Sequence, residues 1–323
     1  MRRLVCRAYG PVDQLTIEDV PEPEPRPGEV VVAVRAAGVN FVDALLVQGL
    51  YQIKPPLPFT PGGEIAGDVV EVGAQVSGIA RGERVVVSCG LGGFVERLAV
   101  PAELARRLPA ELSFERAAAL VQSYATALFA LTRRATVRPD DWVLVLGAGG
   151  GVGLAAVDVA RHLGARVVAA ASSADKLAAA TALGAHASVN YESEDLKSRV
   201  RAITGGGVQV VVDPVGGSYA DAALRTLRGF GQYLIVGFAG GTIPSLRANL
   251  VLLGNRSAVG VDWGAWSMQH PDENRALVDE VLALAGSGAL HPRDPVVYPL
   301  ERAADALAAL HSRRLTGKAV LRP

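Results

Sequence analysis

The stretch Trp142 to Leu163, WVLVLGAGGGVGLAAVDVARHL, constrains the fold more than any other part of the chain. Its apolar run 143–146 predicts a buried parallel strand, and the Ala-rich segment after the glycines, with apolar residues about 3.6 apart, predicts a helix. In the turn between them, Gly147, Gly150 and Gly153 are spaced G-x-x-G-x-x-G rather than G-x-G-x-x-G. A strand, a tight glycine turn and a helix place backbone N–H groups and a positive helix end against a pyrophosphate. The stretch therefore predicts a dinucleotide site, with contacts expected from Ala148, Gly149, Gly150, Gly151 and Val152.

Composition and charge exclude several classes of protein. The chain has 323 residues, 50% hydrophobic and 20% charged, which suffices for two folded domains and is not typical of disorder. Lys and Arg together number 32, as do Asp and Glu, so neither nucleic acid nor an anionic membrane is indicated as a partner. No apolar run reaches the roughly 18 residues of a membrane span, and the start MRRLVCRAYG lacks the apolar core of a signal peptide. We therefore expect a cytoplasmic protein.

Neither a metal site nor a covalent nucleophile is indicated. Cys6 and Cys89 are far apart and outside any C-x-x-C motif, so we expect two reduced thiols. The five histidines form no H-x-x-x-H or H-E-x-x-H pair, which argues against zinc. No G-x-S-x-G elbow or Cys/His pairing suggests covalent catalysis. What remains is a nicotinamide site, in which the cofactor carries the chemistry and the protein positions and polarises.

The chain divides into a β-rich first third and an alternating α/β part. Short strands are expected at 15–20, 29–36, 65–72 and 84–88, an extended connector at 21–28, and loops at 55–63 and 89–93. From about residue 113 the pattern predicts a helix at 114–131, broken near Gln122 and Ser123. The strands expected next are 142–146, 166–171, 187–190, 208–213 and 232–236, and the helices are 151–163, 174–183, one near 193–203, and 218–228. This alternation predicts an α/β fold with a doubly wound parallel sheet of the Rossmann type.

The C-terminal segment is expected to return to the β-rich part. Its pattern predicts a helix at 273–287, a strand at 296–300, a helix at 301–311 and a last strand at 318–321. The predicted domains are therefore a discontinuous substrate domain, residues 1–122 with 265–323, and a cofactor domain, residues 123–264.

The end of the second α/β strand indicates which cofactor binds. In NAD sites an acidic residue at this position accepts hydrogen bonds from the adenosine ribose, and its charge repels a 2′-phosphate. Here the strand ends in AASS at 170–173 with no acid at its tip, and Asp175 falls where a helix cap is expected. Ser172 and Ser173 can donate to a phosphate, and Lys176 follows about one helical turn later, with a solvated surface lysine as the alternative explanation. The group favours NADP(H).

Five motifs carry a resemblance to a known family: AGVNFVD at 37–43, YQIKPPLPFTPGGE at 51–64, the glycine turn at 147–153, VDPVGG at 212–217 and TGK at 316–318. Together they resemble the medium-chain dehydrogenase/reductase superfamily and, within it, the zinc-free quinone oxidoreductase family, along nearly the whole chain. The zinc alcohol dehydrogenases of this superfamily carry a Cys where this chain has Asn40 and a His where it has Gly63. Their second zinc-binding cysteine cluster is also missing after Cys89. The resemblance thus implies a zinc-independent enzyme.

The resemblance also implies an architecture and residue roles. It implies a GroES-like domain and a Rossmann domain, with the active site in the cleft between them. Asn40 and Thr126 match positions at the nicotinamide end, and Tyr51 is the phenol expected near a substrate. The remaining implied cofactor contacts are Asp213, Val215, Gly237 and Phe238 beneath the ring and ribose, and Ser173, Lys176, Tyr191 and Arg313 around the 2′-phosphate. The alternatives are a turn residue for Asn40, a packed loop aromatic for Tyr51, a backbone-bonded helix hydroxyl for Thr126, a strand cap for Tyr191, and a terminal-helix charge for Arg313, which has Arg314 as a rival.

The expected activity is NADPH-dependent reduction of quinones or other conjugated carbonyls. Hydride passes to an electron-poor ring or alkene carbon, and Asn40, Tyr51, backbone N–H groups or water are the candidate donors to the resulting oxyanion. No residue is a compelling general acid, which suits quinones because their reduced product is a stable anion. Asp43 and Glu64 are expected to form structural hydrogen bonds rather than to act as a base. The alternatives are an enoyl-thioester or 2-alkenal reductase on the same fold, and an NADPH-binding structural or regulatory protein, as crystallin members of the family suggest.

A homodimer is the expected assembly. The apolar run SAVGV at 257–261 follows the core strands of the predicted parallel sheet. In relatives this sheet edge pairs with its mate across a two-fold axis, which satisfies the open edge of both sheets.

Overall fold

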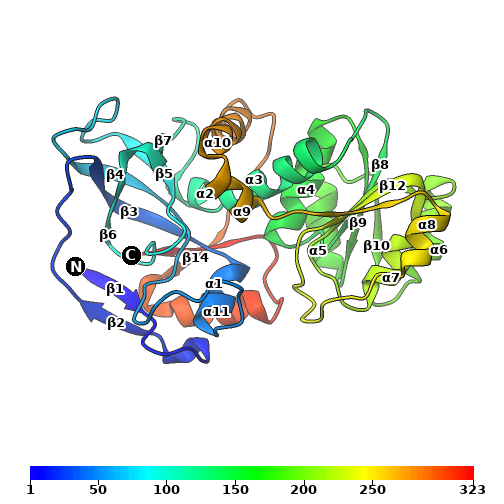
Figure 1. Ribbon diagram of the computed structural model, residues 1–323, viewed down its shortest axis with the longest axis horizontal. Helices are drawn as coiled ribbons and strands as arrows, with labels where there is room; N and C mark the ends of the chain where they lie inside the picture. Colours follow the sequence, from blue (N-terminus) through cyan, green and yellow to red (C-terminus); the bar gives the residue numbers. More distant parts are fainter. The chain divides into compact units, whose positions relative to one another are not determined.

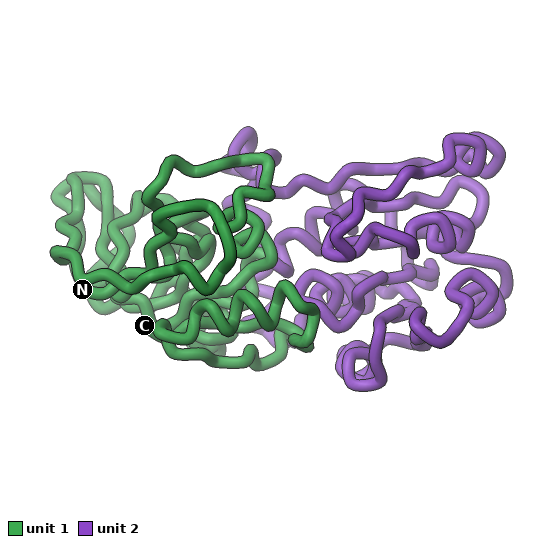
Figure 2. The backbone as a smooth tube through the Cα atoms, turned by 90° about the horizontal axis from the view of Figure 1, so that it is seen from below, with its two compact units in different colours: residues 1–122, 292–323 green, residues 123–291 purple.

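The computed structural model describes residues 1–323, which form two compact units (Figure 2). Unit 1 comprises residues 1–122 and 292–323, and unit 2 comprises residues 123–291. The chain therefore passes from one unit to the other after Gln122 and again after His291. None of the helices is long and apolar enough to cross a membrane.

The division differs from the predicted domains at one segment, because residues 265–291 belong to unit 2 and not to the β-rich unit. The physical reason lies in the end of that segment. The Arg161 guanidinium donates to the Ala289 carbonyl at 2.8 Å, and the His291 N–H donates to the Asp158 carboxylate at 2.5 Å. Both bonds hold the segment to the helix after the glycine turn.

Unit 2 is built on a six-stranded parallel sheet in the order β10-β9-β8-β11-β12-β13 (Figure 1). Counted along the unit, this order is 3-2-1-4-5-6, which confirms the predicted Rossmann arrangement. The strands are β8 (Trp142–Leu146), β9 (Arg166–Ala171), β10 (Ala187–Asn190), β11 (Val208–Asp213), β12 (Leu227–Ile235) and β13 (Ser257–Gly260). The chain runs from β8 outward to β10 and then returns to the other side of β8. Because connections between parallel strands are as a rule right-handed, this reversal places helices on both faces of the sheet.

Apolar side chains on both faces explain why these segments become central strands. The residues of β8 from Val143 to Leu146 are fully buried, as are those of β9 from Val167 to Ala171. The helices of unit 2 are α3 (Val121–Phe129, beginning in unit 1) with a π-helical extension (Ala130–Arg134), α4 (Gly151–His162), α5 (Ala174–Ala182), α6 (Leu196–Thr204), α7 (Tyr219–Leu224), α8 (Ala248–Leu253), α9 (Trp263–Gln269) and α10 (Pro271–Gly286).

Two helix predictions were wrong in their bounds. The expected break at 122–123 lies earlier, because α2 (Phe114–Ala118) ends at Ala118 with Ala119 as its C-cap, and α3 already begins at Val121. The helix expected at 218–228 ends at Leu224, and β12 begins at Leu227. Leu227 pairs with Val208 before a register shift, so the sheet captures residues whose local pattern is helical.

Unit 1 is β-rich. Its seven-stranded sheet has the order β14-β15-β3-β4-β5-β7, with β6 also paired to β3, and β1 and β2 form a separate two-stranded sheet. The strands are β1 (Arg2–Val5), β2 (Thr16–Asp19), β3 (Glu29–Val39), β4 (Glu64–Val72), β5 (Arg84–Ser88), β6 (Arg97–Pro101), β7 (Ala105–Arg107), β14 (Val296–Pro299) and β15 (Ala319–Arg322). The remaining helices are α1 (Phe41–Val47) and α11 (Ala303–His311), with single 3-10 turns at Val12–Gln14, Ala102–Leu104 and Leu300–Arg302.

The last strands return to the β-rich unit, as the sequence predicts. β15 pairs antiparallel with β3, with Ala319 opposite Val39. Leu300 and Leu307 are fully buried in the same apolar core as Val32 of β3. Burial of these side chains, at roughly 1.5–3 kcal/mol each, anchors the end of the chain beside the first third.

A candidate dinucleotide site and a buried polar cluster

The glycine turn joins β8 to α4 in the geometry that its sequence predicts. Gly147 has a φ of +55°, which lies in the left-handed region that favours glycine. Gly150 is the N-cap of α4, and its N–H donates to the Gly147 carbonyl at 2.9 Å. The first N–H groups of an α-helix have no acceptor within the helix, and a glycine N-cap offers no side chain to accept from them. They are therefore available to an anion at the N-terminus of α4.

Two glycines of the turn are required by close packing. A Cβ at Gly153 would lie 2.1 Å from the Gly147 carbonyl oxygen, so α4 approaches the turn too closely for any side chain. A Cβ at Gly149 would lie 2.4 Å from Cβ and 2.5 Å from Cγ of Lys176. The turn and the lysine at the start of α5 therefore form one packed surface.

The structure brings the phosphate-binding candidates together beyond the end of β9. Ser172 follows the strand, Ser173 is the N-cap of α5, and the Lys176 ammonium lies 3.4 Å from the Ser172 hydroxyl oxygen. All three residues are partly buried. Because its stem covers Gly149, Lys176 is not an isolated surface lysine. Asp175 is exposed in the first turn of α5, where Ser173 and not Asp175 is the N-cap.

Tyr191 lies at the neighbouring strand end. It follows β10, and its N–H donates to the carbonyl of Ala171, the last residue of β9, at 3.2 Å. Its ring lies 4.2 Å from the ring of Tyr219, whose hydroxyl donates to Glu192 at 2.6 Å. The Tyr191 backbone is therefore bonded to the residue that precedes Ser172, and Tyr191 and Ser172 lie at the same edge of the sheet.

Asp213 organises the loop after β11. Its carboxylate accepts from the N–H groups of Val215 and Gly216, each at 2.8 Å, and from the hydroxyl of the fully buried Tyr233. Burial raises the pKa of Asp213 above its usual value, and burial together with the Asp213 charge raises the pKa of Tyr233. The Asp213 side chain thus shapes the loop from below. Sequence analysis missed Tyr233, which lies on the strand next to β11.

The candidates after β11 and β12 also come together. The N–H of Gly237 donates to the Asp213 carbonyl at 3.3 Å, and the N–H of Gly240 donates to the Val215 carbonyl at 2.7 Å. Phe238 lies close enough to Gly216 that a Cβ there would be 3.0 Å from its ring. With the glycine turn, these loops surround the carboxyl ends of β8 and β11, where the strand order reverses and where such sheets bind ligands.

Unit 1 contains a separate cluster around Asn40. The Asn40 amide nitrogen donates to Glu64 at 3.0 Å, and its amide oxygen accepts from the ammonium of Lys318. Lys318 also donates to Glu64 at 2.9 Å, and the N–H of Gln122 donates to the other Glu64 oxygen at 2.8 Å. The Glu64 and Lys318 side chains are 1% and 10% exposed. These bonds fix which end of the Asn40 amide is the donor, and one N–H of that amide is not used by them.

Asp43 supports the same segment. Asn40 is the N-cap of α1, and the Asp43 carboxylate accepts from its backbone N–H at 2.8 Å and from that of Gly62 at 3.2 Å. Burial raises the pKa of Asp43 to about 7, although both bonds and the Lys318 charge oppose the shift. The predicted structural roles of Asp43 and Glu64 agree with these contacts. The TGK motif signalled Lys318, but its role is apparent only from the fold.

The remaining candidates are Tyr51, Thr126 and Arg313. Tyr51 is partly buried in the loop after α1, and Thr126 is partly buried within α3. Arg313 is exposed just beyond α11, with a φ of +57°. Tyr51 and Arg313 belong to unit 1 with Asn40, whereas Thr126 belongs to unit 2 with the glycine turn.

Comparisons with known proteins agree with this division. The family described as "Alcohol dehydrogenase GroES-like domain" matches residues 26–110, and the one described as "Zinc-binding dehydrogenase" matches residues 151–283. The chain is 43% identical to the "Quinone oxidoreductase-like protein 2" of Bos taurus over 310 residues, 95% of this chain and 88% of that protein. The solved quinone oxidoreductase of Escherichia coli complexed with NADPH has a TM-score of 0.91 and 31% identity, covering 100% of both chains. The CurK enoyl reductase has a TM-score of 0.89 and 28% identity, covering 99% of this chain and 98% of that one.

The residues do not fit the zinc ion that the second family description names. No three His, Cys, Asp or Glu side chains are grouped so that they could hold a metal ion. At the Asn40 cluster, the Glu64 carboxylate is already bonded to the Lys318 ammonium. Burial raises the pKa of the nearby Cys89 thiol to about 12, which opposes formation of the thiolate that binds zinc.

Proposed function

The chain belongs to the quinone oxidoreductase family of the medium-chain dehydrogenase/reductase superfamily, and on this premise we propose that it is an NADPH-dependent, zinc-independent reductase of quinones and related conjugated carbonyls. NADPH, when bound, supplies the hydride. The protein binds the cofactor and donates hydrogen bonds to the substrate, and separate groups of residues serve these two roles.

The pyrophosphate of the cofactor binds at the N-terminus of α4, on the turn from Ala148 to Val152. This part of the proposal is supported by the glycine N-cap of α4, which has no side chain to accept from the first N–H groups of the helix, and by the close packing at Gly149 and Gly153, which fixes the shape of the turn. Ser172, Ser173 and Lys176 hold the 2′-phosphate, with Tyr191 beside them. No carboxylate lies at the tip of β9 to accept from an unphosphorylated ribose. These features favour NADPH over NADH.

The observation that carries the choice of substrate class is the Asn40 cluster. Lys318 and Glu64 orient the Asn40 amide, so its remaining N–H can donate to an oxygen on which negative charge develops. Asp43, Glu64 and Lys318 are each bonded within the cluster and supply no evident general acid. A quinone tolerates this arrangement because its two-electron product is a stabilised anion that takes protons from water.

Steady-state kinetics test the proposal. NADPH oxidation is measured with a quinone, a 2-alkenal and an enoyl-thioester, each also with NADH. The proposal expects the highest kcat/KM with the quinone and NADPH, and a rate confined to the thioester would contradict it. Quenching of the fluorescence of Trp142, Trp263 and Trp266 by NADPH, with no oxidation by any acceptor, would instead indicate a binding protein.

An enoyl-thioester or 2-alkenal reductase is the second candidate. It is supported by the similarity to the CurK enoyl reductase. Such a substrate needs a proton at carbon after hydride transfer, and the cluster leaves water as the donor. The acceptor panel above separates the two candidates.

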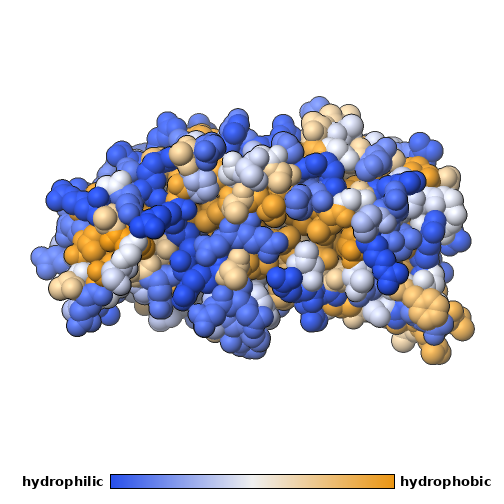
Figure 3. Space-filling view, turned by 90° about the horizontal axis from the view of Figure 1, so that it is seen from above, coloured by the Kyte–Doolittle hydropathy of each residue, from blue (hydrophilic) through white to orange (hydrophobic).

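A homodimer formed through β13 is also part of the proposal. β13 is paired only with β12 and is the edge strand of its sheet. Beside it, Phe230, Leu252 and Leu253 are 80%, 75% and 79% exposed, and the N–H of Phe230 donates to the Gly254 carbonyl at 2.9 Å. Hydrophobic surface is visible at the right-hand end of Figure 3, the end at which Figure 1 labels α8.

Light scattering after size exclusion tests the assembly. The wild type is expected to elute as a dimer and Leu253→Glu as a folded monomer at micromolar concentration, with Leu104→Glu in unit 1 as a control of similar chemistry. A monomeric wild type would refute the assembly. The cytoplasmic location stays a prediction, as does the absence of nucleic-acid partners.

A further inference from the structure

A charged side chain lies buried in the middle of the cofactor helix. Asp158 is two turns along α4 from the glycine turn, and its side chain is 0% exposed. Its neighbours on the helix, Val157 and Val159, are also fully buried. A buried carboxylate is unfavourable by several kcal/mol unless hydrogen bonds and charges compensate it. The proposed function assigns no role to Asp158 or to the residues bonded to it.

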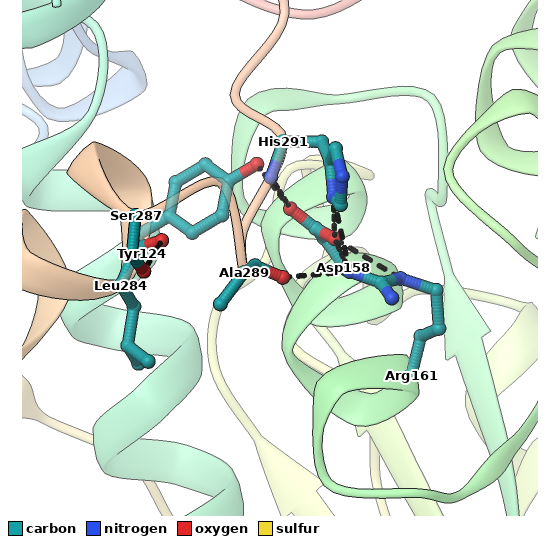
Figure 4. Close-up of polar contacts among 7 residues, drawn as sticks. All are labelled: Tyr124, Asp158, Arg161, Leu284, Ser287, Ala289 and His291. Atoms are coloured by element: carbon teal, nitrogen blue, oxygen red, sulfur yellow. Dashed lines mark hydrogen bonds and ion pairs between the residues drawn. The ribbon is translucent and has the colours of Figure 1, made fainter. Parts of the chain in front are cut away.

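Donors surround this carboxylate (Figure 4). One oxygen accepts from the Tyr124 hydroxyl at 3.1 Å and from the His291 N–H at 2.5 Å. The other accepts from the Arg161 guanidinium at 2.9 Å, and the same guanidinium nitrogen donates to the Ala289 carbonyl at 2.8 Å. These O–H and N–H groups all donate to the carboxylate, and the His291 Nδ1 lies 3.5 Å from its second oxygen. Burial and the Asp158 charge raise the pKa of Tyr124, which therefore keeps its donor proton.

The partners come from the two places where the chain passes between the units. Tyr124 is the second residue of unit 2, two residues before Thr126 on α3. His291 is the last residue of unit 2. The same oxygen of Asp158 thus bonds to both ends of unit 2, and the carboxylate belongs to the helix whose first turn is the candidate pyrophosphate site.

We propose that Asp158 is a positioning residue that holds α3 and the segment 289–291 to the cofactor helix, so that NADPH bound at the start of α4 also restrains both connections between the units. The inference goes beyond the proposed function but relies on its cofactor site. Restraint of this kind is reciprocal, so loosening the connections weakens the binding of NADPH, although a saturating concentration of NADPH still orders the start of α4. Thr126, on the first turns of α3, is then placed by the Tyr124–Asp158 bond.

Hydrogen exchange of the full-length protein, with and without saturating NADPH, tests the coupling. In the wild type we expect NADPH to slow amide exchange at 147–153 and, by about tenfold, at 287–292. Tyr124→Phe removes one hydroxyl and keeps the ring, and Asp158→Asn removes the charge and keeps the size. Both are expected to retain the slowing at 147–153 and to lose it at 287–292. Thr226→Val, which deletes another buried hydroxyl of unit 2, is the matched control and is expected to behave as the wild type.

The outcomes separate this inference from the proposed function. If NADPH slows exchange at 147–153 and the slowing at 287–292 persists in Tyr124→Phe, the bond is merely structural and the inference is wrong. If NADPH slows exchange nowhere in the wild type, the cofactor site and the inference that relies on it are both wrong. Because the coupling is reciprocal, Tyr124→Phe is also expected to raise the dissociation constant for NADPH, by up to about tenfold, and to lower kcat. Should Asp158→Asn fail to fold, Tyr124→Phe decides alone.

Discussion

Reversing the charge of Lys176 tests the cofactor assignment most directly. Lys176→Glu keeps the Cβ and Cγ atoms that cover Gly149, so the packing of the glycine turn is preserved while the ammonium is replaced by a carboxylate. The native ammonium lies 3.4 Å from the Ser172 hydroxyl oxygen and can reach a phosphate held by both. The substitution therefore changes the charge at the 2′-phosphate and leaves the pyrophosphate site unaltered.

The expected effect follows from the loss of a charge-assisted hydrogen bond. Such a bond contributes about 1.5–3 kcal/mol. Lys176 is partly exposed, so solvent screens its charge and the contribution does not exceed that range. The dissociation constant for NADPH should then rise roughly 10- to 150-fold, at about 1.4 kcal/mol per factor of ten. Repulsion from the new carboxylate adds to this increase. NADH has no 2′-phosphate, so its dissociation constant should change by less than about twofold.

Tryptophan fluorescence titration or calorimetry with each nucleotide measures both constants. Lys197→Glu on α6 is the matched control, because it makes the same charge change at an exposed position away from the candidate site. Equal increases for NADPH and NADH would refute the assignment, since they would place Lys176 outside the 2′-phosphate site. A similar loss in Lys197→Glu would show that only long-range charge is measured.

Three further predictions concern the turn and the Asn40 cluster. Gly153→Ala should abolish NADPH binding because its Cβ would meet a turn carbonyl at 2.1 Å, whereas Gly150→Ala, with its nearest contact at 3.4 Å, should bind measurably in calorimetry. Glu64→Gln should lower the free energy of unfolding by about 3–5 kcal/mol and lower kcat, because it leaves the Lys318 ammonium buried without its carboxylate. Adding Lys318→Met should recover the stability, measured by urea unfolding, but not kcat. If the two substitutions instead lower the free energy of unfolding additively, the side chains do not act as a pair. Burial raises the pKa of Asp43 to about 7, so the folded protein keeps a proton that the unfolded chain releases above about pH 4. The contribution of Asp43 to the free energy of unfolding is therefore full at low pH and falls by about 1.4 kcal/mol per pH unit from about pH 4 to pH 7. An Asp43→Asn variant with the same pH dependence of stability as the wild type would contradict this.

The central strands of unit 2 were predictable because burial on both faces makes their sequence uniformly apolar. The predicted bounds of β8, β9 and β11 agree with the structure, and so do those of the partly exposed edge strand β10. The short strands β1, β6 and β7 were missed because each carries arginine on its partly exposed residues, and the sheet, rather than local preference, makes them strands.

The site divides in the same way. The glycine turn and Ser172–Lys176 are local, so their spacing in the sequence signals their chemistry. The bonds from Lys318 to Asn40 and Glu64 join residues 278 and 254 positions apart, and no local pattern specifies them. Asp158 looks like an ordinary polar residue of an amphipathic helix until its fully buried environment is known.

The pairing of Lys318 with Glu64 has a consequence for how acceptors reach the Asn40 cluster. The two opposite charges cancel at short range, and Asp43, with a pKa raised by burial to about 7, carries only a partial charge near neutrality. The cluster therefore projects only a weak field into solution, that of the fractional negative charge of Asp43, although it is built from three ionisable groups. An uncharged ring loses nothing by approaching it, and an anionic acceptor gains no electrostatic acceleration. Ionic strength should accordingly govern capture of the phosphorylated nucleotide and leave encounter with the acceptor almost unchanged.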